Sequence, residues 1–435
     1  MHPNWRRARA VAHSLIRDLH DLRNCAVRLR DSPLSLATMP AQLPPELIDR
    51  ILDHLHRDRR ALAACALASH VMLPTSRYHR FRDLTLHLRQ VSTLMSLIDS
   101  APNLALAINS VCVRFKDWAD PKQELEFLTR LPALSSFGMV TPAYQRVSVE
   151  HLAVVASHIP ALTSLFLCGP GVITAPLLLS GLSLFRALRE VRLHSIDVHF
   201  PPEPDVPYDL TPLPPLRRLE SRASDGAPLI SRWLQVHSAT PGLLSLQHTI
   251  QDPRDAIQFD ATAIFCAGTV KNLEIVFAPE GRMTDALRGS EFSLESFSVL
   301  ETCTLRFAFG EMCVAQNESL LSIPTILSHL SSPFLRTITI ALVVDNVEDL
   351  RSLNSECAVR NLSPAYFEDM RVLEWTTIEQ LLTGENLGSI QALVLEGQGQ
   401  CHLLESYLRD CCPTLHSRRL VSLVTVDKED QDRWW

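Results

Sequence analysis

Glycine and aromatic residues are scarce in this sequence: its 435 residues include 14 glycines, and aromatic side chains make up 6% of the chain. No uncharged apolar run reaches the roughly 18 residues that a transmembrane helix needs, so we expect no membrane partner. Basic residues are not in excess either, since the formal net charge is −7. Proteins that hold nucleic acid usually carry a basic stripe that neutralises phosphates, so nucleic acid is a poor expectation.

Motifs of catalysis are also missing. The sequence contains no phosphate-binding G-x-x-x-x-G-K-[ST] loop, no H-E-x-x-H zinc helix and no G-x-S-x-G nucleophile turn. A late cluster invites comparison with a zinc site, but its two adjacent cysteines cannot easily bind one ion together; its members are Cys401, His402, Cys411, Cys412 and His416. We therefore predict a chain that is not an enzyme, with no catalytic residue, no metal and no cofactor.

The eleven cysteines are an odd number, and most lie in apolar runs, as Cys65 and Cys266 do. Such cysteines behave as small free hydrophobes, which favours the cytoplasm, the nucleus or both. The first 39 residues are rich in arginine, but Asp18, Asp21 and Asp31 interrupt them, whereas mitochondrial transit peptides avoid acids. We expect a solvated helical extension over residues 1–39.

A short apolar template recurs along the chain in nearly constant register. Large apolar residues occupy its first and fourth positions and usually its sixth, as in Leu162-x-x-Leu165-x-Leu167. Neighbouring matches are 26 to 28 residues apart, with middle positions at Leu84, Val111, Phe137, Leu165, Val191, Leu219, Leu246 and Leu273. A period of about 20–29 residues, with a short strand and a helical or irregular return, is typical of leucine-rich repeats.

The template also predicts which strand residues are buried. Alternate residues of a strand point to opposite faces, so Leu165 and Leu167 should face inward and Phe166 outward. One repeat cannot bury its apolar edge alone, and stacking on its neighbours must stabilise it. We predict an α/β fold in which residues 81–435 form a divergent leucine-rich-repeat solenoid of parallel strands with helical or irregular returns, one of them a helix within His151–Pro160.

Beyond residue 273 the register loosens. Further matches centre on Cys303, Ile338, Leu373, Leu393 and Leu423. The longer intervals are interpreted as loops inserted into a continuing solenoid, and the Pro-dense segment 200–215 as an extended connection. The match Met370-x-x-Leu373-x-Trp375 predicts a strand with Glu374 facing outward. The alternative is an irregular, leucine-rich α/β protein.

Residues 40–80 have the pattern of two short amphipathic helices. Pro44 and Pro45 fit the start of the first helix, whose apolar face comprises Leu47, Ile48, Ile51, Leu52 and Leu55. Asp58 is a plausible N-cap for the second helix, in which Leu62, Cys65 and Leu67 are apolar and which Pro74 ends or closely follows.

This stretch resembles an F-box. Leu43, Pro44 and Glu46 match the Leu-Pro-x-Glu start of the family pattern, and the next Ile and Leu match Ile51 and Leu55. The second-helix pattern falls on Leu62, Cys65, Leu67, Ala68, Ser69 and Met72, and Leu73, Pro74, Ser76 and Arg77 match the Leu-Pro-x-Ser-Arg of fungal members. Met72 stands where the family usually has Trp, and Ala68 and Ser69 replace Val and Cys.

The resemblance implies an F-box-like domain at 40–80 that binds the Skp-type adaptor of a cullin–RING ubiquitin ligase of the SCF type. The residues divided between the core of the box and the adaptor would be Leu43, Pro44, Ile48, Ile51, Leu52, Leu55, Leu62 and Leu67. The alternative is a helical cap that seals the first repeat, and the two interpretations are compatible.

The outward strand positions are the expected contacts with a target protein. At the centre of the chain they are Phe166, Arg192, Glu220, Gln247 and Glu274. This mixed charge suits a protein partner better than a polyanion. The expected function is recruitment of a target to the ligase. A scaffold with a degenerate box and a receptor gated by a small molecule are the alternatives.

Overall fold

The computed structural model describes fourteen segments of the chain, namely residues 44–56, 58–115, 121–141, 148–169, 172–199, 214–222, 226–237, 242–250, 253–277, 292–309, 320, 322–344, 367–397 and 400–426. The expected extension over 1–39 lies outside them, as do residues 200–213 of the Pro-dense segment and most of the longer inserted loops. The chain divides into two compact units, residues 1–84 with 96–109 and residues 85–95 with 110–435.

The first unit is helical. Its described helices are α2 (Pro45–His54), α3 (Arg59–Ala68), α4 (Leu73–Arg82) and α6 (Leu104–Ala107). Asp58 caps α3 as predicted, because its Oδ1 accepts hydrogen bonds from the backbone N–H groups of Arg60 and Ala61 at 2.9 and 2.8 Å. Pro74 lies in the first turn of α4, where its missing N–H costs no hydrogen bond. The segments β1 (Asp83–His87), η1 (Leu88–Gln90) and α5 (Val91–Ser100) carry the chain across the boundary between the units.

The second unit is an α/β structure on a long parallel sheet. Twelve strands form this sheet in the order β1-β2-β3-β4-β6-β8-β9-β10-β11-β12-β13-β14. Neighbours from β2 to β14 pair in parallel. The strand bounds after β1 are β2 (Ser110–Arg114), β3 (Ser136–Val140), β4 (Ser164–Cys168), β6 (Glu190–His194), β8 (Arg218–Arg222), β9 (Ser245–Ile250), β10 (Asn272–Phe277), β11 (Thr302–Phe309), β12 (Thr337–Val344), β13 (Ala392–Gly397) and β14 (Val421–Thr425). A separate parallel pair joins β5 (Val172–Thr174) to β7 (Asp197–His199).

The predicted template lies on these strands. From β2 to β13 its fourth position is the second residue of each strand and is buried: Val111, Phe137, Leu165, Val191, Leu219, Leu246, Leu273, Cys303, Ile338 and Leu393. Because each of these residues pairs with its counterpart on the next strand, they form one apolar row through the core. The prediction of inward-facing Leu165 and Leu167 and a more accessible Phe166 is confirmed.

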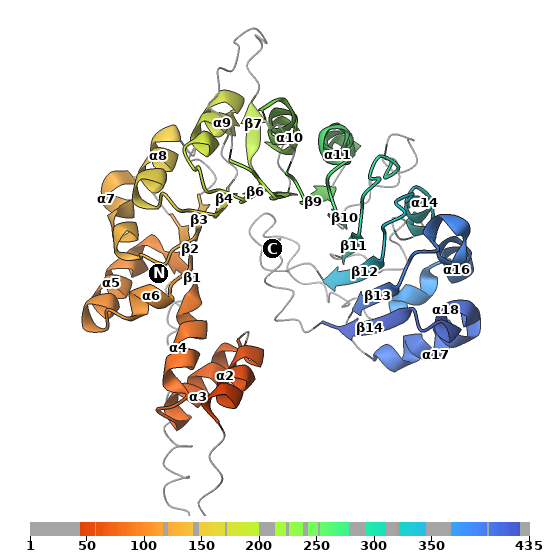
Figure 1. Cartoon of the computed structure of the whole chain (residues 1–435), viewed down its shortest axis with the longest axis horizontal. Coiled ribbons are helices and arrows are strands. Elements are labelled where there is room, and N and C mark those ends of the chain that lie inside the picture. The colour runs from red at the N-terminus through yellow and green to blue at the C-terminus, as the bar shows by residue number, and fades with distance from the viewer. Residues whose placement is uncertain are drawn as a thin grey trace, which may run out of the picture. The chain divides into compact units, whose positions relative to one another are not determined.

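Helices and 3₁₀ turns make the returns between strands. Figure 1 shows the helices from α8 onward on one side of the sheet, and no described helix covers the other side. Their bounds are α7 (Pro121–Leu125), η2 (Glu126–Arg130), α8 (Val149–His158), α9 (Ala175–Ser183), α10 (Gly226–His237), α11 (Pro253–Cys266), α14 (Ile323–Ser328), η4 (Phe367–Val372), α16 (Trp375–Thr383), η5 (Glu385–Leu387), α17 (Cys401–Cys411) and α18 (Pro413–Ser417). Helix α8 confirms the helix predicted within 151–160, and Ser148 caps it.

The strand predicted at Met370–Trp375 is wrong. Met370 lies in η4, and Trp375 begins α16. The Trp375 indole Nε1–H donates to the Met370 carbonyl at 2.7 Å, and both side chains are buried. Trp375, Ile378 and Leu382 continue at helical spacing as the buried residues of α16. Glu374 is therefore the N-cap residue of this helix and takes no part in the outward row of the sheet.

Candidate functional site

The five residues predicted as target contacts form one continuous row across the sheet. Phe166 pairs with Arg192, Arg192 with Glu220, Glu220 with Gln247 and Gln247 with Glu274 on successive strands from β4 to β10. All five point away from the apolar core because they alternate with its buried residues along each strand. The side of the sheet that carries them is the one without described helices (Figure 1).

Glu220 is the centre of a network of hydrogen bonds and ion pairs. Its Oε1 lies 2.8 Å from Nε2 of His194 and 3.0 Å from Nη2 of Arg222. Its Oε2 lies 3.6 Å from Nε of Arg192 and 3.8 Å from Nη2 of Arg218. Only 4% of the Glu220 side chain is exposed, whereas Arg192 and Arg218 are 40% and 42% exposed. The Glu220 carboxylate is thus buried, whereas the side chains of Arg192 and Arg218 reach the surface.

Gln247 extends this network. Its amide is assigned with the nitrogen toward Glu220, because the opposite assignment would place oxygen against oxygen. In this orientation the nitrogen donates to Glu220 Oε2 at 3.2 Å, and the Gln247 oxygen accepts from Arg222 Nη2 at 3.1 Å. Gln247 is as fully buried as Glu220. Both residues lie in the predicted row, but their side chains are buried. They therefore position the neighbouring groups and contribute almost no accessible surface themselves.

The charges around Glu220 fix its protonation state. Burial by itself would raise its pKa, but the hydrogen bond from His194 and the positive charges beside it outweigh this and lower the pKa to about 2. Burial also lowers the pKa of His194 from its ordinary value, against the opposing effect of Glu220. Glu220 is therefore ionised at neutral pH, and a neutral His194 donates to it through Nε2–H.

A second bridge joins the far end of the row. Arg306 on β11 lies with Nε 2.6 Å from Oε1 of Glu274 on β10 and with Nη1 2.9 Å from Oε2 of Glu396 on β13. Arg306 pairs with Ala341 on the intervening strand β12, and Ala341 pairs with Glu396. Because alanine has a short side chain, the guanidinium can cross over β12 to reach the second carboxylate.

The other end of the row is apolar. The Phe166 ring meets the His194 ring edge to face, with the centroids 4.7 Å apart. Gly138 on β3 provides the space beside it, since a Cβ atom there would lie 3.0 Å from both Cys112 Sγ and Phe166 Cδ1. Burial raises the pKa of the Cys112 thiol to about 11, so this thiol is neutral at pH 7. The sheet thus presents a neutral patch beside a charged network.

Sequence reasoning missed His194, Arg218 and Arg222 around Glu220, and Arg306 and Glu396 in the second bridge. Each lies two residues before or after the central outward position of its strand, and therefore has the same parity on that strand. Extending the alternation by one outward residue in each direction would have found them. The pairings themselves depend on side-chain length and register, which the sequence does not show.

The eight predicted adaptor contacts divide into groups with different burial. Leu43 lies outside the described residues, and Pro44 is exposed at the start of α2. Leu52 and Leu62 are buried in the helical unit, and Ile48 and Leu55 are half-buried. Ile51 is 51% exposed and Leu67 is 72% exposed. Leu47 on α2 and Val71 before α4 are also exposed and were not in the prediction.

The late cysteine cluster has no metal-binding geometry. Cys411 Sγ and Cys412 Sγ lie 3.8 Å apart, and Cys412 is buried, with its thiol directed at the Trp375 carbonyl at 3.4 Å. Across the described segments, no group of three or more His, Cys, Asp or Glu side chains could hold a metal ion. No helix among them is both long and apolar enough to cross a membrane.

No family model matches the sequence, and no curated protein matches it. A function for this chain must therefore follow from its own residues and contacts.

Proposed function

We propose that the chain recruits a target protein to a cullin–RING ubiquitin ligase of the SCF type. In this proposal the helical unit is an F-box-like module that binds the Skp-type adaptor, and the second unit is a leucine-rich-repeat-like solenoid that holds the target. The chain supplies proximity between the target and the ubiquitin-charged enzyme and performs no chemistry itself.

The observation that carries the proposal is the apolar surface of the helical unit. Leu52 is the buried side chain of α2, whereas Leu47 and Ile51 on the same helix and Leu67 on α3 are exposed. All four residues lie within residues 40–80, the stretch that resembles an F-box. Burying one such side chain in a complex contributes about 1.5–3 kcal/mol, so a few of them can support specific binding.

The geometry of the helical unit also fits a module with its own core. Thr75 on α4 donates to Asp49 on α2 at 2.6 Å, and His79 Nε2 lies 2.9 Å from Asp53 Oδ1. These contacts tie α2 to α4, so that the exposed apolar residues are presented by a fixed set of helices. Met72, which stands in place of the usual Trp, is half-buried just before α4.

For the target, the outward row of the sheet is the proposed binding surface. Phe166 and Arg192 offer an apolar and a charged contact next to each other, and Glu220, Gln247 and Glu274 position the charged groups. Charges that are held in place before binding give specificity more than affinity.

The test is a binding measurement between the full chain and a purified Skp-type adaptor. The test variant is Ile51→Asp/Leu67→Asp. The matched control is Leu177→Asp/Ile264→Asp on α9 and α11, where the exposures of 43% and 73% are close to those of the test pair. We expect wild type and control to bind and the test variant to lose at least about tenfold in affinity, equivalent to about 1.4 kcal/mol. Circular dichroism establishes that all three are folded.

Two results would count against the proposal. Absence of binding by folded wild-type protein would remove the ligase role and leave a protein-interaction scaffold with a degenerate box. Equal loss in the test and control variants would show that the surface named here is not the adaptor site.

A further inference from the structure

Arginines gather at the edge of the sheet where β6 and β8 begin. Arg189 and Arg217 immediately precede these strands, and the Arg217 N–H donates to the Arg189 carbonyl at 2.7 Å. The two residues therefore lie side by side, about 4.8 Å apart as neighbouring strands are. Arg186 lies three residues before Arg189, in the connection between α9 and β6, and Arg192 and Arg218 lie in the strands themselves. We call these five residues the arginine cluster.

The arginine cluster is only partly neutralised. Glu190 pairs with Arg192 and Arg218 through Oε1 at 2.8 and 3.3 Å, and Glu220 lies 3.6 and 3.8 Å from the same two arginines. The remaining members, Arg186, Arg189 and Arg217, are exposed, and no described residue forms an ion pair with them. A chain with a net charge of −7 thus concentrates free positive charge at one place.

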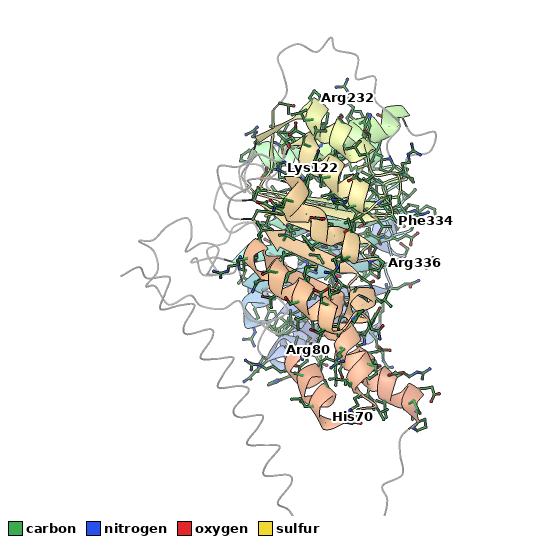
Figure 2. All side chains as sticks on the ribbon, turned by 90° about the vertical axis from the view of Figure 1, so that its left-hand side faces the viewer. His70, Arg80, Lys122, Arg232, Phe334 and Arg336 are labelled. Atoms are coloured by element: carbon green, nitrogen blue, oxygen red, sulfur yellow. The ribbon has the colours of Figure 1, made fainter. Side chains whose placement is uncertain are left out.

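Beyond the arginine cluster, the residues that precede the next strands are joined by backbone hydrogen bonds, but their side chains are not all basic. Leu244 donates to the Arg217 carbonyl at 2.8 Å, Lys271 to Leu244 at 2.9 Å, and Glu301 to Lys271 at 2.8 Å. Leu244 is exposed, and Lys271 Nζ is paired with Glu301 Oε1 at 2.7 Å. Arg336 follows on the same edge, and Figure 2 shows it with Phe334 along one flank of this unit.

We propose that the arginine cluster docks an acidic, extended segment of the target polypeptide, whose carboxylates pair with Arg189 and Arg217. Guanidinium groups match carboxylates with two parallel hydrogen bonds, and clustered arginines suit an acidic chain better than a single charge. Leu244 next to the cluster offers an apolar contact. A polyanion such as nucleic acid needs a longer cationic track, which Leu244 and the Lys271–Glu301 pair interrupt.

This inference rests on the target-binding half of the proposed function and names the chemistry of the target. Its test needs no adaptor. Failure of adaptor binding and failure of peptide binding are therefore separate results.

The experiment measures fluorescence anisotropy with the full chain and a labelled peptide in which glutamate alternates with serine. The same peptide with glutamine in place of glutamate and an oligothymidylate of equal length are compared. The test variant is Arg189→Glu/Arg217→Glu. The control is Arg114→Glu/Arg232→Glu, which makes the same charge change at exposed positions on β2 and α10; Figure 2 labels Arg232.

We expect the glutamate peptide to bind wild type and control, to bind the test variant at least about tenfold more weakly, and to dissociate as salt is raised. Arg189→Gln/Arg217→Gln provides the same readout if charge reversal disturbs folding. No binding of the glutamate peptide by wild type, equal loss in test and control, equal binding of the glutamine peptide, or tighter binding of oligothymidylate would each overturn the inference.

Discussion

Replacing Glu220 with Gln tests whether the polar network stabilises the sheet. The substitution keeps the size of the side chain and removes its charge. Glu220 is almost fully buried and lies 3.0 Å from Arg222 and 2.8 Å from His194. The neutral amide would remove a negative charge that lies 3.0 Å from Arg222, whose side chain is only 12% exposed. Breaking a buried pair in this way is destabilising because the remaining charge stays out of water.

The size of the effect follows from the pKa of Glu220. A carboxyl whose pKa is 4.5 in the unfolded chain and about 2 in the folded protein contributes about 3 kcal/mol to the free energy of unfolding at neutral pH. Because the folded-state pKa is the lower one, this contribution is complete above pH 4.5 and is lost as the pH falls toward 2. The Glu220→Gln variant should lack both the contribution and this part of the pH dependence.

Hydrogen exchange, read by mass spectrometry on peptides that cover β6 and β8, reports the free energy of opening at these strands. We expect faster exchange in Glu220→Gln at pH 7, corresponding to a loss of about 3 kcal/mol. Urea unfolding between pH 2 and pH 6 should show a shallower pH dependence than wild type. Glu385→Gln, at an exposed position, is the control. A loss below about 1 kcal/mol, or a pH dependence parallel to wild type, would refute the reasoning.

Two further substitutions test local packing and capping. Gly138→Ala places a Cβ atom 3.0 Å from Cys112 Sγ and Phe166 Cδ1, so we expect it to lower the free energy of unfolding by on the order of 1 kcal/mol. Gly268→Ala, whose added Cβ would meet no atom beyond its chain neighbours within 4 Å, should be neutral or slightly stabilising in the same thermal-unfolding assay, and an equal loss in both would contradict the packing argument. Asp58→Ala removes the cap of α3 and should cost about 1 kcal/mol, whereas Asp58→Asn should keep most of it; an Asn variant as unstable as the Ala variant would argue against capping.

The strands of the second unit could be predicted because each repeats the same requirement. Most strands bury two apolar side chains on one face, so a template such as Leu165-x-Leu167 recurs at a nearly fixed interval. The strand prediction was correct even where a polar residue occupies a template position, as at His248, which is buried in the core. Burial lowers the pKa of His248 to about 4, so the ring is neutral, and its Nε2 lies 3.1 Å from the Asp255 carbonyl. The strands could be recognised despite such exceptions because the matches recur at nearly constant intervals, and no single residue was decisive.

The same template failed at Met370–Trp375 because apolar residues three apart occur in helices as well as in strands. Trp375 could have been assigned to a helix from Ile378 and Leu382, which continue its apolar face. The outward surface of the sheet was predictable only as a row. Alternation identified Glu220 and Gln247 as outward residues, but their burial arises from the arginines and the histidine that neighbouring strands bring around them.

A side chain that faces outward is therefore not always accessible, and this limits which groups of the surface could contact a target. Glu220, Arg222 and Arg306 already have partners of opposite charge, so a target that paired with them would have to break contacts of 2.6–3.0 Å to form its own. Exchanging one buried ion pair for another gives little net affinity. Binding energy at this surface must therefore come from groups that the network leaves unsatisfied. Those are the aromatic face around Phe166 and the arginines at the strand starts, which places the expected contacts at the margin of the polar network and makes its centre a rigid support.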